Sequence, residues 1–304
     1  MKPFLLLLAL SSTLFAQDIQ RFVAIDNVCA WPNLTLMSDG SINTTIFGQP
    51  SHGQVAGAVE CWNSKDGQFW EKRGIPAPNE SQTNRMNVAA GLAKNGDLLV
   101  LCSGWTDVKQ PQRPKQGAFR DDILSSWICR SSDGGKTWSE AVTLFEGHFW
   151  NCHTGMVQKA DRLYWATDDL ALGKLRGPRI IAGDLSGDPM NPKAWRMSAP
   201  VPFPGVPEAM TNPQFDKLTS QYLEPNVIDV RGKLRVLMTV KPKRQSTSGL
   251  CAVLDFEDKG GLLDLKFTQF HPMPGGQLKF CVIWDEVSKM FWATANLVVD
   301  GQGR

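Results

Sequence analysis

The sequence lacks the cysteine spacing that marks metal sites and small disulfide-bonded domains. Its 7 cysteines stand singly, without a C-x-x-C pair, so we expect neither a metal nor a cofactor. Most of them lie in apolar, strand-like segments, where cysteine behaves as a small buried hydrophobic residue. One or two disulfides remain open, and the sequence does not say which cysteines they would join. The cysteines are Cys29, Cys61, Cys102, Cys129, Cys152, Cys251 and Cys281.

Net charge and long apolar runs are also scarce. A formal charge of +2 is too small to predict binding to nucleic acid or to a membrane surface. The apolar run at residues 4–10, between Lys2 and Ala16, has the form of a secretory signal peptide at residues 1–16. A membrane anchor is the alternative, but a spanning helix needs about 20 apolar residues. We therefore expect a secreted or periplasmic protein whose mature chain, from Gln17, has no membrane span.

The sequence does contain a repeated unit, in which two apolar strands joined by a tight polar turn precede a loop and two further strands. In the first copy, residues 34–37 and 42–47 flank a turn whose Asp39 and Gly40 tolerate the backbone angles of a tight hairpin. Four-stranded units at this spacing, without convincing helical periodicity, predict a β-propeller. Further copies begin at Asn87, Cys152, Glu224 and Leu278.

The last copy of the repeat has only two predicted strands, so the repeat amounts to about four and a half blades. Either residues 17–304 are a propeller domain truncated at the C-terminus, six-bladed in full, or residues 21–25 supply the last strand of a closed five-bladed ring. An unclosed ring exposes strand edges. We favour the truncated domain.

One turn motif resembles a known family. Ser131, Asp133, Gly135 and Trp138 belong to a segment of the form S-x-D-x-G-x-T-W, which resembles the Asp box of sialidases and other BNR-repeat proteins. In such a turn the aspartate accepts backbone N–H groups, the glycine takes the strained angle and the tryptophan buries its ring. In sialidases the turn joins the third and fourth strands of a blade on the face opposite the active site. The resemblance implies an all-β, sialidase-type propeller in which Asp133 is structural. Looser copies of the motif lie at residues 64–70 and 188–195.

The face opposite these turns is expected to carry the function. Strand alternation places there the loops that enter the first strand and leave the second strand of each copy. Positive charge gathers in these loops, which suits an anionic sugar such as a sialic or uronic acid. We expect His52, Arg85, His153, Glu224 and Lys241 to converge at one mouth of the channel. The candidate residues on this face are His52, Arg85, Asn87, His153, Glu224, Asn226, Lys241 and Lys279.

The catalytic resemblance to sialidases is partial. Sialidases hold the substrate carboxylate with three arginines and use a tyrosine, activated by a glutamate, as the nucleophile. Glu224 matches the glutamate that opens a blade, but residues 30–32 read A-W-P where sialidases carry R-I-P. Neither Tyr164 nor Tyr222 falls at the place of the nucleophile.

The leading hypothesis is a secreted, exo-α-sialidase-like glycoside hydrolase that cleaves an anionic carbohydrate or glycoconjugate. Glu224 and His52 are the candidate proton-transfer groups, since histidine can act as acid or base near neutral pH. Two alternatives stay open on the same fold: a propeller that binds glycan or protein without turnover, and a histidine-dependent polysaccharide lyase. The candidate substrate-binding residues are Arg85, Asn87, His153, Asn226, Lys241 and Lys279.

Overall fold

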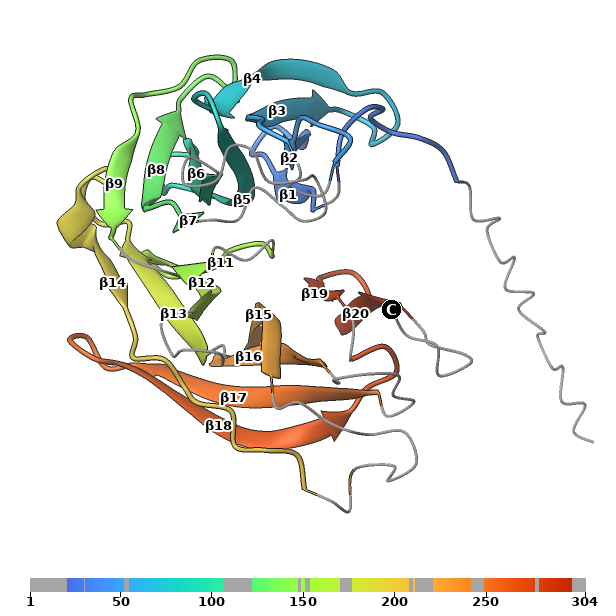
Figure 1. The fold of residues 1–304 in the computed structure, drawn as a ribbon, viewed down its shortest axis with the longest axis vertical. Coiled ribbons are helices and arrows are strands. Elements are labelled where there is room, and N and C mark those ends of the chain that lie inside the picture. Colours follow the sequence, from blue (N-terminus) through green and yellow to red (C-terminus); the bar gives the residue numbers. More distant parts are fainter. Residues whose placement is uncertain are drawn as a thin grey trace, which may run out of the picture.

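The computed structural model describes residues 21–29, 31–51, 55–106, 122–146, 149–150, 154–169, 177–207, 210, 221–241, 249–276 and 279–296. Strands dominate these residues, and η1 (Pro192–Ala194) is a single turn of 3-10 helix among them. The strands form five sheets, which stand side by side along an arc (Figure 1). The expected signal peptide, residues 1–16, lies outside the described residues.

The sheets follow one another along the chain and are numbered in that order. Sheet 1 contains β1 (Asn33–Leu36), β2 (Ile42–Phe47), β3 (Val59–Ser64) and β4 (Glu71–Ala77). Sheet 2 contains β5 (Thr83–Leu92), β6 (Leu98–Thr106), β7 (Asp122–Ile123), β8 (Ser126–Ser131) and β9 (Val142–Phe145). Sheet 3 contains β10 (Phe149–Trp150), β11 (Val157–Lys159), β12 (Arg162–Asp169), β13 (Gly177–Asp184) and β14 (Trp195–Met197). Sheet 4 contains β15 (Gln221–Val230), β16 (Lys233–Lys241), β17 (Leu250–Asp258) and β18 (Leu263–Pro272), and sheet 5 contains β19 (Phe280–Asp285) and β20 (Met290–Ala295).

The inner strands β1, β5, β11, β15 and β19 lie nearest the centre of the arc (Figure 1). Neighbouring inner strands contact one another along the whole series. Each runs through a tight hairpin into its antiparallel partner, and Gly40 and Gly96 take positive φ angles of 81° and 88° in two of these turns, as glycine readily does. The all-β, propeller-type arrangement of four-stranded units is therefore confirmed.

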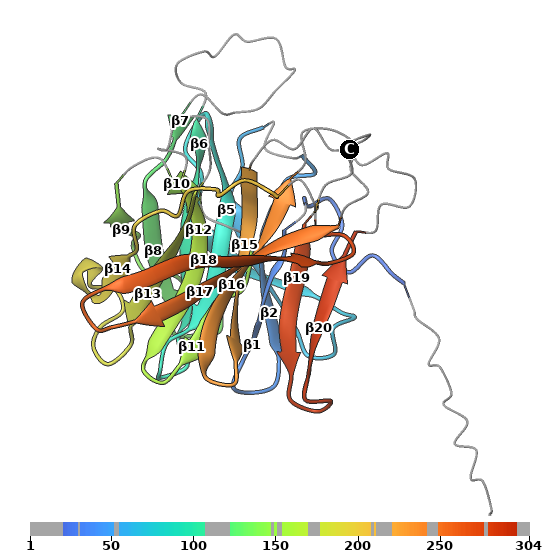
Figure 2. The ribbon, with the colours of Figure 1, turned by 90° about the horizontal axis from the view of Figure 1, so that it is seen from below.

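The turns between third and fourth strands share one side of the arc. Asp66 lies between β3 and β4, Asp133 between β8 and β9, and Asp188 between β13 and β14. Arg130 Nη1 lies 3.4 Å from Asp188 Oδ1, which joins the turns of sheets 2 and 3. The prediction that these aspartates take equivalent places is confirmed. We call this side, to which the β1–β2, β15–β16 and β19–β20 hairpins also point (Figure 2), the turn side, and the opposite side the mouth side.

The apolar core lies between neighbouring sheets. Cys61 of sheet 1 shares one cluster of buried residues with Val88 of sheet 2. Leu101 of sheet 2 shares another with Trp165 of sheet 3. Because inner sheets are covered on both faces, strands such as β6 are buried along their whole length. Burying each large apolar side chain contributes about 2 kcal/mol, so the sheets are held together chiefly by packing between them.

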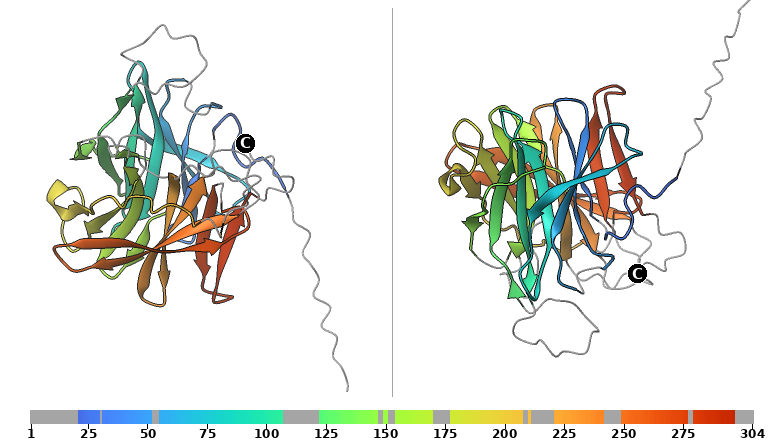
Figure 3. Two further views of the ribbon diagram at one scale, coloured as in Figure 1. Left: turned by 60° about the horizontal axis from the view of Figure 1, so that its bottom comes forward. Right: turned by 90° about the horizontal axis from the view of Figure 1, so that it is seen from above.

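The arc is open at its last sheet. Sheet 5 has only two strands in the described part of the chain, and it lies beside sheet 4 (Figure 3). Its Ile283 and Trp292 are 61% and 56% exposed. Residues 21–25 are described and form no strand. Four full blades and a two-stranded fifth are thus confirmed for the described residues, and the alternative of a ring closed by residues 21–25 is wrong for them.

Candidate functional site

A pocket of about 350 Å³ opens on the mouth side. Residues of sheets 1, 3, 4 and 5 meet in it, because the segments entering the first strands and leaving the second strands end on the same side of each sheet. We call it the mouth pocket. Of the candidate residues from the sequence, Glu224 and Lys279 lie in it. Its lining residues are Trp31, Pro32, Thr154, Glu224, Lys279, Phe280, Cys281, Thr294, Ala295 and Asn296.

Three side chains from three sheets contact one another in the mouth pocket. Lys279 Nζ lies 2.8 Å from Glu224 Oε1 and 3.7 Å from the centre of the Trp31 ring. The ammonium group is therefore held by a carboxylate and by the electron-rich face of an indole, both of which stabilise a cation. The Glu224 side chain is 15% exposed and that of Lys279 is 41% exposed, so a ligand can reach the lysine from solvent.

One carboxylate oxygen of Glu224 makes no hydrogen bond with the described residues. Oε1 pairs with Lys279, but Oε2 is buried and has no hydrogen-bond partner. Buried polar atoms are seldom left unpaired. Oε2 is therefore a buried acceptor whose hydrogen-bonding capacity the described residues leave unused.

Two other candidates make contacts within the scaffold. Asn226 Nδ2 donates to the carbonyl of Phe280 at 3.2 Å, and its Oδ1 accepts from the N–H of Val282 at 3.4 Å, so the amide joins β15 to β19. Asn87 is fully buried in β5, and neither polar atom of its side chain has a partner. A role for either in binding substrate stays a prediction.

Arg85 is also turned into the scaffold. Its guanidinium carbon lies 3.8 Å from the centre of the Trp127 ring, and Nη2 lies 3.4 Å from Glu80 Oε2. The side chain is only 6% exposed and does not line the mouth pocket. Packing on Trp127 accounts for its position, and its predicted role in substrate binding stays a prediction.

Of the five residues expected to converge at the channel mouth, Glu224 lines the mouth pocket and Arg85 does not. His52 and His153 lie outside the described residues, and so does the side chain of Lys241. Trp31 was missed as a site residue, although an aromatic residue in the segment entering the first blade could have been singled out. Thr154 gives no signal in the sequence that would place it beside Glu224.

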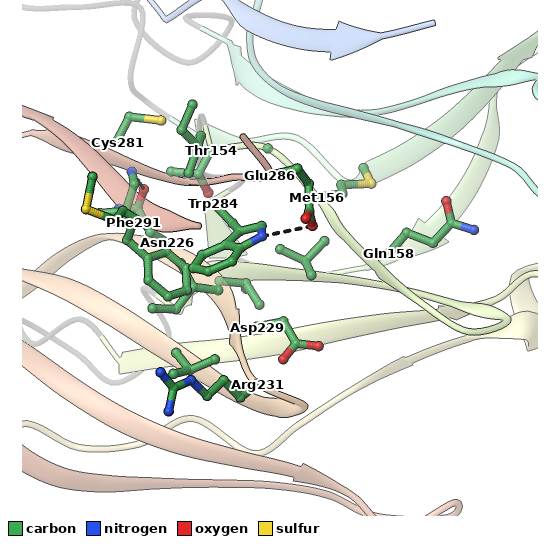
Figure 4. Close-up of a pocket in the computed structure, with 18 of the residues that line it drawn as sticks. Thr154, Met156, Gln158, Asn226, Asp229, Arg231, Cys281, Trp284, Glu286 and Phe291 are labelled. Carbon is green, nitrogen blue, oxygen red and sulfur yellow. Dashed lines mark hydrogen bonds between the residues drawn. The ribbon is translucent and has the colours of Figure 1, made fainter. Parts of the chain in front are cut away.

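A larger cavity of about 960 Å³ lies along the channel toward the turn side, between β11, β15 and the β19–β20 hairpin. Figure 4 shows its wall of apolar and aromatic side chains, including Met156, Trp284 and Phe291. Trp284 Nε1 donates to Glu286 Oε1 at 2.8 Å, and Asp229 Oδ1 accepts from the N–H of Gly232 at 2.6 Å. Both bonds are local, the first within the β19–β20 hairpin and the second within the β15–β16 hairpin.

The Ser131–Trp138 turn has local, structural hydrogen bonds. Asp133 Oδ1 accepts from Ser131 Oγ at 2.8 Å and from the N–H of Thr137 at 2.9 Å, and its Oδ2 accepts from Thr137 Oγ1 at 2.6 Å. The Thr137 hydroxyl and N–H hold the pKa of Asp133 well below its usual range. Gly135 has φ of 91°, and a Cβ there would lie 2.5 Å from Cys61 Sγ. The turn lies on the turn side, away from the mouth pocket.

Two classes of feature are absent from the described residues. No group of three or more histidine, cysteine, aspartate or glutamate side chains among them is arranged to hold a metal ion. None of the helices in that part of the chain is long and apolar enough to cross a membrane.

Comparison with solved structures finds the same architecture in other proteins. No protein-family model and no curated protein sequence matches this sequence. A protein of unknown function from Dyadobacter fermentans is 17% identical, with a TM-score of 0.58 over 86% of this chain and 73% of that one. The Trypanosoma rangeli sialidase bound to the inhibitor DANA is 14% identical, with a TM-score of 0.59 over 89% of this chain and 44% of that one. A mutant of the NanB sialidase from Streptococcus pneumoniae is 11% identical, with a TM-score of 0.53 over 84% of this chain and 54% of that one.

These likenesses concern the arrangement of the strands. The chain spans about half the length of the two sialidases, 44% and 54%. At sequence identities of 11% to 17% the match shows a common arrangement of the blades. It does not show that the residues lining a site are the same. The chain has the fold of the sialidases, a β-propeller of four-stranded antiparallel sheets.

Proposed function

We propose that the protein is a glycan-cleaving enzyme that acts on an anionic sugar, with Glu224 as a proton-transfer group and Lys279 as the group that binds the negative charge. The observation that carries this proposal is the contact of Glu224, Lys279 and Trp31 in one pocket at the channel mouth. A carboxylate, an ammonium group and an aromatic ring can together bind an acidic sugar and exchange a proton with it.

Each group has a separate task in this proposal. The indole of Trp31 offers an apolar face with a polar edge, against which a sugar ring can stack. Lys279 forms a charge-assisted hydrogen bond to the sugar carboxylate. The Glu224 carboxylate, whose side chain is 15% exposed, exchanges a proton with the bond that is cleaved or with the attacking group. A positioned acid or base contributes about 10² to 10⁴ in rate.

A second candidate function is binding without turnover. Among the described residues that line the mouth pocket there is no arginine and no tyrosine, whereas the resemblance to sialidases implies both around the substrate. Such a site would recognise a glycan through Lys279 and Trp31 and leave it intact. The lyase alternative depends on His52 and His153, which lie outside the described residues.

The deciding experiment is an activity and binding screen of the purified chain with sialosides and uronate oligosaccharides. For an enzyme, we expect Glu224→Gln to lower kcat about 100-fold or more. We expect Lys279→Met, which removes the charge and keeps a long side chain, to raise KM. Glu286→Gln, an exposed carboxylate on the turn side, is the matched control and should change neither. Binding without product release would favour the second candidate, and full activity of Glu224→Gln would exclude Glu224 as the proton-transfer group.

We also propose export and a longer propeller domain. The charged Lys2 and the apolar run at residues 4–10 support cleavage after residue 16, and the open edge of sheet 5 supports further strands in the full protein. The intact mass of the protein purified from its source tests the first, since a signal peptide predicts a chain that begins at Gln17. The sequence of the full gene tests the second.

A further inference from the structure

We infer that Asp168 is a positioning residue for Glu224. Its buried carboxylate, on β12 of sheet 3, holds the backbone of Glu224 in a left-handed conformation that directs the Glu224 side chain into the mouth pocket. The effect on catalysis rests on the proposed function, whereas the effect on the backbone does not.

Glu224 has an unfavourable backbone conformation. Its φ angle is 49°, in the left-handed region that few residues other than glycine, asparagine and aspartate adopt. The next residue is Pro225, which restricts a preceding residue to extended conformations. Left-handed backbone at an ordinary residue is strained and persists only where the surrounding structure enforces it. Something outside β15 must therefore hold this residue in place.

Strand β12 and the segment that enters β11 restrain the backbone on both sides of Glu224. The N–H of Glu224 donates to Asp168 Oδ2 at 3.3 Å, and Thr154 Oγ1 donates to the carbonyl of Pro225 at 2.8 Å. Asp168 is 1% exposed, so its carboxylate is fixed by the packing around it.

The extra residue at Glu224 also reverses which side chains of β15 face the core and which face the channel. The pairing of β15 with β16 shifts register between Leu223 and Pro225, which is a β-bulge. Tyr222 and Val227 belong to one buried cluster shared by sheets 3 and 4, although they are five residues apart and a regular strand would place them on opposite faces. The bulge accounts for the change of face, as bulges commonly redirect a side chain.

The redirection explains how Glu224 reaches sheet 5. In a regular strand Glu224 would share a face with Tyr222, which is buried in the cluster between sheets 3 and 4. Instead its carboxylate lies 2.8 Å from Lys279 of sheet 5, on the side to which Asn226 also bonds. By stabilising the bulge, Asp168 directs the carboxyl group of Glu224 into the mouth pocket.

The test compares Asp168→Ala with Asp168→Asn in the full chain. In crystal structures of the variants, we expect residue 224 to leave positive φ in Asp168→Ala and its carboxylate to move beyond hydrogen-bond distance of Lys279. Asp168→Asn, whose amide oxygen can still accept the N–H of Glu224, should keep the bulge. If Asp168→Ala does not fold, Asp168→Leu, which has nearly the same size and no acceptor, should show the same loss of the bulge. An unchanged Glu224 backbone in the variant that lacks an acceptor would overturn the inference.

Kinetics supply a second readout on any glycan that the parent protein cleaves. We expect Asp168→Ala to lower kcat at least tenfold with less than a threefold change in KM, and Asp168→Asn to recover part of kcat. Asp258→Ala, which removes another buried carboxylate between sheets 3 and 4 but on the turn side, is the matched control for general loss of packing and should leave kcat unchanged. If the parent cleaves no glycan, the proposed function fails while the crystallographic test still decides the role of Asp168.

Discussion

The hydroxyl of Tyr164 in sheet 3 donates a hydrogen bond to Asp258 Oδ2 in sheet 4, at 3.0 Å. Arg196 Nη2, also from sheet 3, lies 3.2 and 3.0 Å from the two oxygens of the same carboxylate. The N–H of Gly260 donates to Asp258 Oδ1 at 2.9 Å. Since the Asp258 side chain is only 9% exposed, this carboxylate ties the two sheets together on the turn side.

We expect Asp258→Ala to lower the free energy of unfolding by about 2 to 3 kcal/mol, because the Tyr164 hydroxyl and the Arg196 guanidinium lose a charged partner. Urea unfolding followed by fluorescence measures the change. Glu257→Ala is the matched control: this neighbouring carboxylate is 64% exposed and should contribute less than about 0.5 kcal/mol. Equal losses in the two variants would contradict a special role for Asp258.

Acid should weaken the same contact. Burial by itself would raise the pKa of Asp258, but the N–H of Gly260, the Tyr164 hydroxyl and Arg196 outweigh it and hold this pKa below 3.8. The unfolded state thus binds the proton more readily, so the stabilisation is full above about pH 4 and is lost as the pH falls through the lower folded-state pKa. We expect the stability advantage of the parent over Asp258→Asn to stay constant from about pH 7 to about pH 5 and to shrink below about pH 4. An advantage that does not change with pH would show that the charge of Asp258 contributes nothing.

Arg85→Ala separates the structural from the ligand-binding role of this residue. We expect the variant to lose about 1 to 2 kcal/mol of stability, because the guanidinium packs on Trp127 in a buried site. Glycan affinity, measured by titration calorimetry, should stay unchanged, in contrast to Lys279→Met. A loss of affinity without a loss of stability would instead support the role in substrate binding that the sequence predicts.

The cysteines should differ in their reactivity. Burial raises the pKa values of Cys61 and Cys102 to about 12, so almost none of either thiol is in the reactive thiolate form near neutral pH. Cys281 is exposed. We expect iodoacetamide to modify Cys281 of the native protein first, and to modify Cys61 and Cys102 only after unfolding, as followed by mass spectrometry of peptides. Rapid modification of Cys61 in the native protein would contradict its position between sheets 1 and 2.

Part of the site could be predicted from the sequence and part could not. Glu224 and Lys279 were placed on the mouth side because strand alternation fixes which ends of the strands share a side. Their contact, the stacking of Lys279 on Trp31 and the bulge at Glu224 depend on side chains from sheets 1, 3, 4 and 5 that are far apart in the sequence. Arg85 shows the reverse case, since its position in the sequence suggests the channel but its side chain packs on Trp127 within sheet 2.

The sequence by itself determined the blades. Apolar alternation, the Asp-Gly and Asn-Gly turns and the Ser131–Trp138 motif act over fewer than about ten residues, so they specify hairpins and the order of strands without reference to the rest of the chain. Only the tertiary structure decided how blades from distant parts of the chain meet. The left-handed conformation of Glu224 shows why. Strand β15 alone disfavours it, and it is held by Asp168 of β12 and by Thr154 of the segment that enters β11. These bonds exist only once the sheets have packed together.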